Sequence, residues 1–239
     1  MKRTVKVMCL VALALGIGTA AQAQFRQSVY LNGTIPTGDF ASGIKGVDTV
    51  CLTIDNIGQD ATAGLGLGYR ASYRFDVGVG MVAPYANVDL LWNSIAGKWR
   101  DKYAGENYGK PTYFNIPVQL GVSYIYDELP WPDISAYGEL GFGTDLLWIT
   151  SEGKGSGNEK FAYKMDFAFT WSAGLGAYFG KYFSAGLYYY GMGKHYIDYT
   201  KGTLEDNTIA ASQDALNQAN KHREQRTVGS VALRIGFHF

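Results

Sequence analysis

The most constraining feature of this sequence is a strict alternation of apolar residues with small or polar ones over whole segments of the chain. Between residues 61 and 75 every odd position is apolar, namely Ala61, Ala63, Leu65, Leu67, Tyr69, Ala71, Tyr73 and Phe75. The even positions between them carry only threonine, glycine, arginine and serine. Successive side chains of a β-strand point to opposite faces, so this period of two predicts a strand with two chemically different faces.

Seven more segments repeat the pattern. It is clear near residues 113–126, 134–148 and 164–179, and weaker in 25–36, 78–93, 183–197 and 226–239. Short joints near 76, 127–133 and 180–182 alternate with long polar connections at 37–60, 94–112, 150–163 and 198–225. The sequence therefore predicts an all-β fold, an eight-stranded antiparallel up-and-down barrel. Pro84 and Pro117 cannot donate to a strand ladder, and we expect a β-bulge at each.

The apolar faces of these strands are expected to contact lipid. They contain no charged residue over lengths greater than the roughly 9–11 residues with which a strand crosses a bilayer. A soluble barrel with an apolar interior would instead expose a face dense in lysine and glutamate, whereas only 18% of this chain is charged. Since unpaired backbone groups are costly in hydrocarbon, a closed transmembrane β-barrel is the architecture that fits.

The first 23 residues are predicted to be a secretory signal peptide rather than part of the fold. A basic start is followed by an apolar run and by Ala21-Gln22-Ala23, an A-x-A cleavage site, which leaves residues 24–239 as the barrel domain. The remaining chain carries 18 basic and 21 acidic residues, so nucleic acid is not an expected partner. Cys51 is then the only cysteine left, and a free loop thiol is expected. No cofactor is expected.

The C-terminal strand carries the most specific resemblance to known proteins. Its apolar residues occupy every second position and end on a terminal phenylalanine: Val231, Leu233, Ile235, Phe237 and Phe239. This pattern resembles the assembly signal of outer-membrane barrels, and the whole chain after the signal peptide resembles the OmpX-like and OmpA-transmembrane-like barrel family. The stretch from Asn115 to Val118 is also similar to small porin-like barrels. The resemblance implies an integral protein of a bacterial outer membrane. Outer-membrane lipid and the barrel-assembly machinery are the partners it implies.

Isolated charges on the polar faces are predicted to form a charge network in the lumen, made of Arg70, Glu139, Arg234, Asp89, Asp145 and Asp166. Arg70, Glu139 and Arg234 fall at similar depth on three strands. An eight-stranded barrel is only wide enough to be filled by side chains, so we expect a paired plug across it. A gated conduction path is the alternative.

Function is less constrained than fold. We expect a non-enzymatic barrel with a structural or surface-interaction role, whose extracellular ligand or partner is unknown. A narrow channel for small or apolar solutes is the alternative. An apolar lumen lining near the long connections would favour this channel, whereas a paired polar lumen, which the alternation predicts, favours a closed scaffold. A membrane-embedded lipid-modifying hydrolase or acyltransferase comes third. His195 has Asp198 nearby but no serine at a telling spacing, His222 lies at a loop end rich in lysine and arginine, and His238 has no evident partner. Residues 204–223 are expected to form a short surface helix.

Overall fold

The computed structural model describes residues 25–41, 61–95, 112–150, 160–204, 209–210 and 225–239. The predicted signal peptide with its cleavage residues Ala21 and Ala23, and also Cys51, lie outside this part of the chain.

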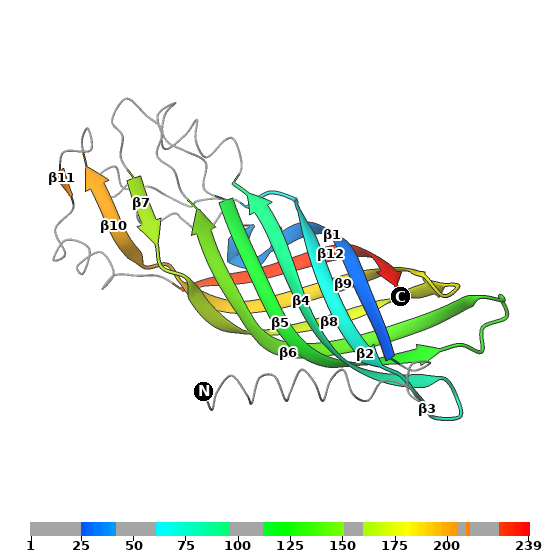
Figure 1. Ribbon diagram of the computed structural model, residues 1–239. Coiled ribbons are helices and arrows are strands. Elements are labelled where there is room, and N and C mark those ends of the chain that lie inside the picture. Colours follow the sequence, from blue (N-terminus) through cyan, green and yellow to red (C-terminus); the bar gives the residue numbers. More distant parts are fainter. Residues whose placement is uncertain (1–24, 42–60, 96–111, 151–159, 205–208, 211–224) are drawn as a thin grey trace, which may run out of the picture.

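Eight long strands close into one barrel (Figure 1). Their order around the wall is β2-β1-β12-β9-β8-β6-β5-β4, and the pairing of β4 with β2 completes the circle. All neighbours are antiparallel, as predicted for an up-and-down barrel. The strands are β1 (Phe25–Thr37), β2 (Gly64–Tyr73), β4 (Met81–Ser94), β5 (Thr112–Tyr126), β6 (Ile134–Thr150), β8 (Asp166–Phe179), β9 (Phe183–Tyr196) and β12 (Gln225–His238). A short β3 (Phe75–Asp76) follows β2 and continues its pairing with β4.

The registers give the barrel its stagger. A circuit of paired residues that starts at Thr37 on β1 passes through every strand and returns to β1 at Gln27, ten positions earlier. A stagger of this kind requires the strands to tilt relative to the barrel axis. The tilt brings residues from distant segments to a common depth in the lumen.

The expectation of bulges at the two prolines was wrong. Pro84 pairs with Val122 and Pro117 pairs with Asp145 in ladders that keep one register throughout. Each proline instead lies at a gap in the ladder that its strand makes with its other neighbour, and that ladder resumes in the same register beyond the gap. The residue opposite the proline in this gap is Tyr73 for Pro84 and Asp89 for Pro117. The missing N–H therefore coincides with a break in the ladder and no extra residue is needed.

A register shift does occur elsewhere in the wall, between β12 and β9. The pairing slips between Thr227 and Gly229, beside Gly193, whose φ of 80° lies in the left-handed region. Glycine adopts that conformation at no steric cost. Beyond it the inward-facing parity of β9 changes from even to odd positions, which turns His195 into the lumen.

The outer wall is apolar, as the alternation predicts. Leu120 is 70% exposed and Leu65 67%, and every one of the eight strands carries outward residues of this kind. Soluble monomers rarely expose contiguous apolar surface of this extent, whereas a barrel that crosses a bilayer requires it. The C-terminal residues Val231, Leu233, Ile235, Phe237 and Phe239 belong to this outward belt. Within the described residues, no helix is both long and apolar enough to span a membrane.

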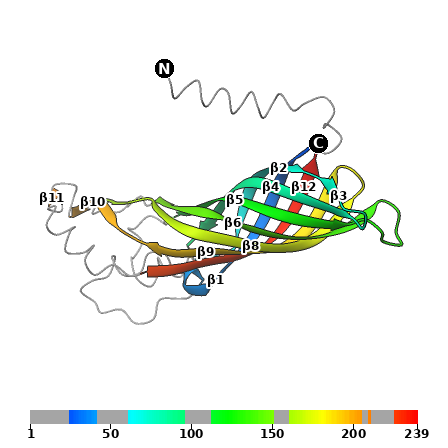
Figure 2. The ribbon, with the colours of Figure 1, turned by 90° about the horizontal axis from the view of Figure 1, so that it is seen from below.

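The two ends of the barrel differ. The end that holds the turns at 77–80, 127–133 and 180–182, together with the C-terminus, is called here the short-turn end (Figures 1 and 2). Beyond the other end lies a small second sheet of β7 (Lys160–Tyr163), β10 (Tyr199–Leu204) and β11 (Ile209–Ala210). Leu204, Ile209 and Ala210 are thus in strands and not in the helix expected for 204–223, because their backbone groups pair in a hairpin. The other residues of that segment lie outside the described part of the chain.

Candidate functional site: the filled lumen

At mid-depth the lumen is crossed by a buried ion pair between β2 and β6. The guanidinium of Arg70 donates two hydrogen bonds to the carboxylate of Glu139, one of them from Nη1 to Oε2 at 2.6 Å. The side chains are only 4% and 2% exposed. A bidentate arginine–carboxylate pair fixes both geometry and charge, and it compensates part of the desolvation of each ion.

A second pair lies against the first. Arg234 on β12 donates from Nη2 to Oδ2 and Oδ1 of Asp89 on β4, at 3.0 and 3.2 Å. Its Nη1 is also 3.7 Å from Oε1 of Glu139, which links the two pairs. Arg70, Asp89, Glu139 and Arg234 are called here the central charge cluster. Its two positive and two negative groups balance.

Neutral side chains add hydrogen bonds to Arg234 and Asp89 in this cluster. Asn32 accepts from Nε of Arg234 at 3.0 Å and donates to Oδ1 of Asp89 at 3.2 Å. Asn87 and Tyr190 donate to Oδ2 of Asp89 at 2.7 and 3.1 Å. A buried polar network stabilises a structure only when its members are satisfied, and Asp89 meets that condition here.

Tyrosine rings enclose both guanidinium groups. The Cζ of Arg70 lies 3.9 Å from the ring centre of Tyr85, and that of Arg234 lies 4.1 Å from the ring centre of Tyr188. Tyr30 contacts both, at 5.2 and 4.5 Å. Cation–π contact of this kind adds attraction where water is excluded. The rings therefore pack around the charges inside the lumen.

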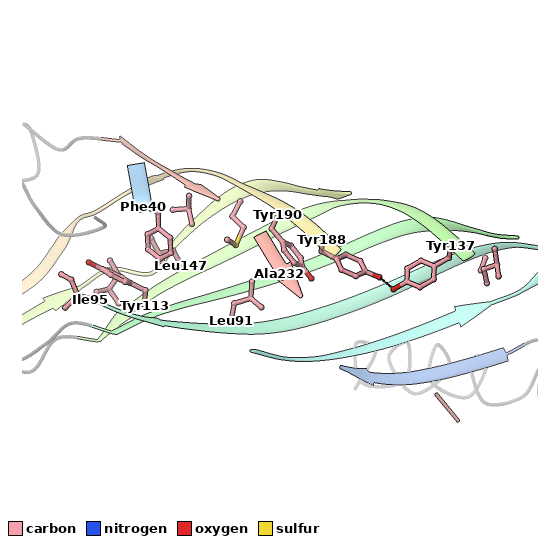
Figure 3. Close-up of a cluster of buried hydrophobic side chains, with 14 residues drawn as sticks. Phe40, Leu91, Ile95, Tyr113, Tyr137, Leu147, Tyr188, Tyr190 and Ala232 are labelled. Carbon is pink, nitrogen blue, oxygen red and sulfur yellow. Dashed lines mark hydrogen bonds between the residues drawn. The ribbon is translucent and has the colours of Figure 1, made fainter. Parts of the chain in front are cut away.

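Towards the long connections the lumen contains a cluster of buried apolar side chains (Figure 3) beside buried polar ones such as Asn93 and Asn115. The ring of Phe40 packs edge-on against Tyr113 at 5.0 Å. The buried apolar side chains of this region are called here the outer apolar plug and comprise Phe40, Leu91, Ile95, Tyr113, Leu147, Ile149, Met192 and Val228. An apolar plug and a charged cluster thus follow one another along the same lumen.

Phe40 reaches the plug from the short 3-10 helix η1 (Gly38–Phe40), which follows β1. The neighbouring Asp39 accepts a hydrogen bond from the backbone N–H of Thr227 at 3.0 Å. This hydrogen bond lowers the pKa of the Asp39 carboxyl below its usual value of 3.8, and Arg226 and Lys194 act in the same direction. The Phe40 carbonyl also accepts from the N–H of Ala61 at 2.9 Å. η1 is therefore tied to β12 and to the residues just before β2.

His195 lies between two of the predicted lumen carboxylates. Its Nε2 is 3.1 Å from Oδ2 of Asp145, and its Nδ1 is 3.3 Å from Oδ2 of Asp166. Asp145 and His195 are fully buried, while the side chain of Asp166 is 28% exposed. Asn115 is also fully buried. Within the described residues no group of three or more His, Cys, Asp or Glu is placed to hold a metal ion.

His238 lies near the short-turn end of the lumen. Its Nδ1 is 2.6 Å from the hydroxyl of Ser28, and its Nε2 is 2.8 Å from the hydroxyl of Ser184. The sequence had suggested no evident partner for this histidine, because Ser28 and Ser184 are distant in the chain and only strand pairing brings them together. All three side chains are buried within the barrel.

The six predicted network residues thus fall into two groups. Arg70, Glu139, Arg234 and Asp89 meet in the central charge cluster. Asp145 and Asp166 lie apart from it beside His195, which the prediction had associated with Asp198. Parity alone could not place His195 inward, because the change of parity depends on the backbone of Gly193. The sequence reasoning also did not place Tyr188 and Tyr190 beside the guanidinium groups, although their even positions on β9 were a usable signal.

Comparisons with known proteins give similarity of structure only. No family model matches the chain, and no curated protein matches it. Among solved structures, the chain is similar to Neisserial surface protein A (12% identity, 90% of this chain and 95% of that chain, TM-score 0.42). It is also similar to Ail of Yersinia pestis (13%, 90% and 98%, 0.41) and to outer membrane protein AlkL (13%, 90% and 90%, 0.42). At these scores the assignment of fold rests on the strand pairing of the chain itself.

Proposed function

We propose that this protein is a non-enzymatic integral protein of a bacterial outer membrane, with a barrel closed to solutes and a structural or surface-interaction role. One observation carries the proposal: the central charge cluster and its tyrosines occupy the lumen at mid-depth. An eight-stranded barrel leaves no room for water beside such side chains. In an outer membrane the short turns of such a barrel face the periplasm and the long connections face the cell exterior.

The placement of the histidines supports a role without catalysis. A lipid-modifying enzyme needs its nucleophile and base where the substrate can reach them, at the membrane surface. Ser28, Ser184 and His238 instead point into the barrel and are at most 3% exposed. His195 is fully buried and contacts carboxylates.

The test of this proposal is release of entrapped solute from vesicles that contain the folded barrel. Phosphatidylcholine vesicles loaded with glucose are compared with and without the protein, and a porin of known conductance is the positive control. We expect release equal to that of empty vesicles. Glucose release that scales with the amount of folded barrel would contradict a closed lumen.

A second candidate function is the passage of apolar solutes through the outer half of the barrel. The outer apolar plug is the specific observation that favours it, since an apolar lining near the long connections is what such a path requires. Its gate would be Phe40, the residue that enters the plug from outside the strands. Uptake of a labelled alkane into the same vesicles, faster with Phe40→Ala than with the native chain, distinguishes this role from a closed scaffold.

A further inference from the structure

The lipid-facing wall is interrupted by a groove of about 680 Å³ that extends over β5, β6, β8, β9 and β12. Val122 and Tyr124 form one margin, and Tyr189 and Val231 form the other. All four side chains belong to the outward apolar belt. The groove is therefore a feature of the surface in contact with the membrane and is separate from the lumen.

Two small outward residues create the groove. Along one register row, Gly138 lies between Tyr124 and Leu175. In the next row, Ala173 lies between Leu140 and Tyr189. A Cβ placed on Gly138 would meet no atom within 4 Å, which shows that the space above it is open. Large side chains on neighbouring strands thus stand around two positions where the wall has little or no side chain.

The floor of the groove offers its occupant no polar partner, and of the two tyrosine hydroxyls at its margins that of Tyr124 donates to the carbonyl of Val79. Glu139 and Tyr188 contribute to its floor, but both side chains point into the lumen. The carboxylate of Glu139 is engaged by Arg70, and the hydroxyl of Tyr188 donates to that of Tyr137 at 2.8 Å. What faces the groove is therefore hydrocarbon, so a complementary ligand is also hydrocarbon and not a headgroup or a sugar.

We propose that this groove binds one acyl chain of a phospholipid as a resident lipid. The groove is continuous with the apolar belt, so a chain reaches it without leaving the bilayer. Gly138 is four residues into β6 from the short-turn end, or about 13 Å along the strand, so the groove begins in the half of the wall on that side. This inference rests on the membrane location in the proposed function, but not on whether the lumen conducts.

A second copy of the chain fits the groove less well than a lipid chain does. A stable protein interface takes roughly 20–30 residues from each partner. The groove is lined by twelve residues, and the wall around it is the convex surface of a barrel. A single flexible chain fills such a recess, whereas a second barrel would contact only its margins.

Filling the groove is the direct test, and the chain offers a matched control. Gly138→Trp and Ala173→Trp both place a large ring in the groove. Gly33→Trp places the same ring on β1, at another outward glycine where an added Cβ meets no atom within 4 Å. β1 lies four strands from β6 around the wall. Tryptophan is compatible with a lipid-facing position, so all three variants are expected to fold.

The measurement is native mass spectrometry after reconstitution in vesicles of phosphatidylethanolamine and phosphatidylglycerol and mild detergent extraction. Folding and insertion are checked first by the heat-dependent shift in gel mobility. We expect one retained phospholipid on the native chain and on Gly33→Trp, and at least a tenfold lower retained fraction on the two groove variants. No retained lipid on the native chain, or equal retention by all variants, would overturn the proposal. A dimer lost only in the groove variants would assign the groove to a second copy. Failure of the native chain to insert would refute the membrane location itself.

Discussion

Removal of the Glu139 charge is the perturbation with the largest expected effect on this barrel. Glu139→Gln keeps the volume of the side chain but leaves Arg70, which is 4% exposed, without its carboxylate. It also removes the negative group 3.7 Å from Arg234, so the central charge cluster acquires a net positive charge. Breaking a buried ion pair by removing one partner costs about 3–5 kcal/mol. We expect the free energy of unfolding to fall by that amount.

Urea unfolding of the barrel in vesicles, followed by tryptophan fluorescence, measures this difference. Glu128→Ala, at an exposed carboxylate in the turn between β5 and β6, is the control and should change stability by less than about 0.5 kcal/mol. The double variant Arg70→Met with Glu139→Met removes a positive and a negative charge together, and it should be less destabilised than Glu139→Gln. A loss below about 1 kcal/mol for Glu139→Gln would refute the reasoning, because a solvated pair on an open path behaves in that way.

Three further predictions concern the wall and the outer mouth. Gly174→Ala places its Cβ 2.3 Å from the ring of Tyr188 and should destabilise the barrel by about 1–3 kcal/mol in urea unfolding, whereas Gly138→Ala should be near neutral. Phe40→Ala empties part of the outer apolar plug and should cost about 3–5 kcal/mol, again by urea unfolding. The Asp39 carboxyl has a folded-state pKa below 3.8, so its contribution to stability is present above that pH and is lost as the pH falls through the folded-state value. Carbon-detected NMR titration should show that midpoint, and a midpoint above 3.8 would contradict the hydrogen bond.

Most of the fold could be predicted because the side chains of a strand alternate with a period of two. The alternation held from Leu65 to Tyr73 and along the three other clear segments, and it also placed Arg70, Glu139 and Arg234 on inward faces. Eight strands of similar length with alternating short and long joints left few topologies besides an up-and-down barrel.

What could not be predicted depends on backbone details that parity does not encode. The positive φ of Gly193 reverses the parity of β9 and sends His195 to Asp145 and Asp166. Pauses in the ladders, invisible in the sequence, accommodate Pro84 and Pro117 without bulges. Phe40 enters the lumen from a connection that the alternation had assigned to no strand.

The most direct test of the closed lumen is single-channel recording of the refolded barrel in a planar bilayer, with Glu139→Ala recorded beside it. The native protein is expected to insert without conductance steps if, as we propose, the paired charges and tyrosines close the lumen. Reproducible steps from the native protein, altered in size by Glu139→Ala, would establish an ion path through the central charge cluster and contradict a closed barrel.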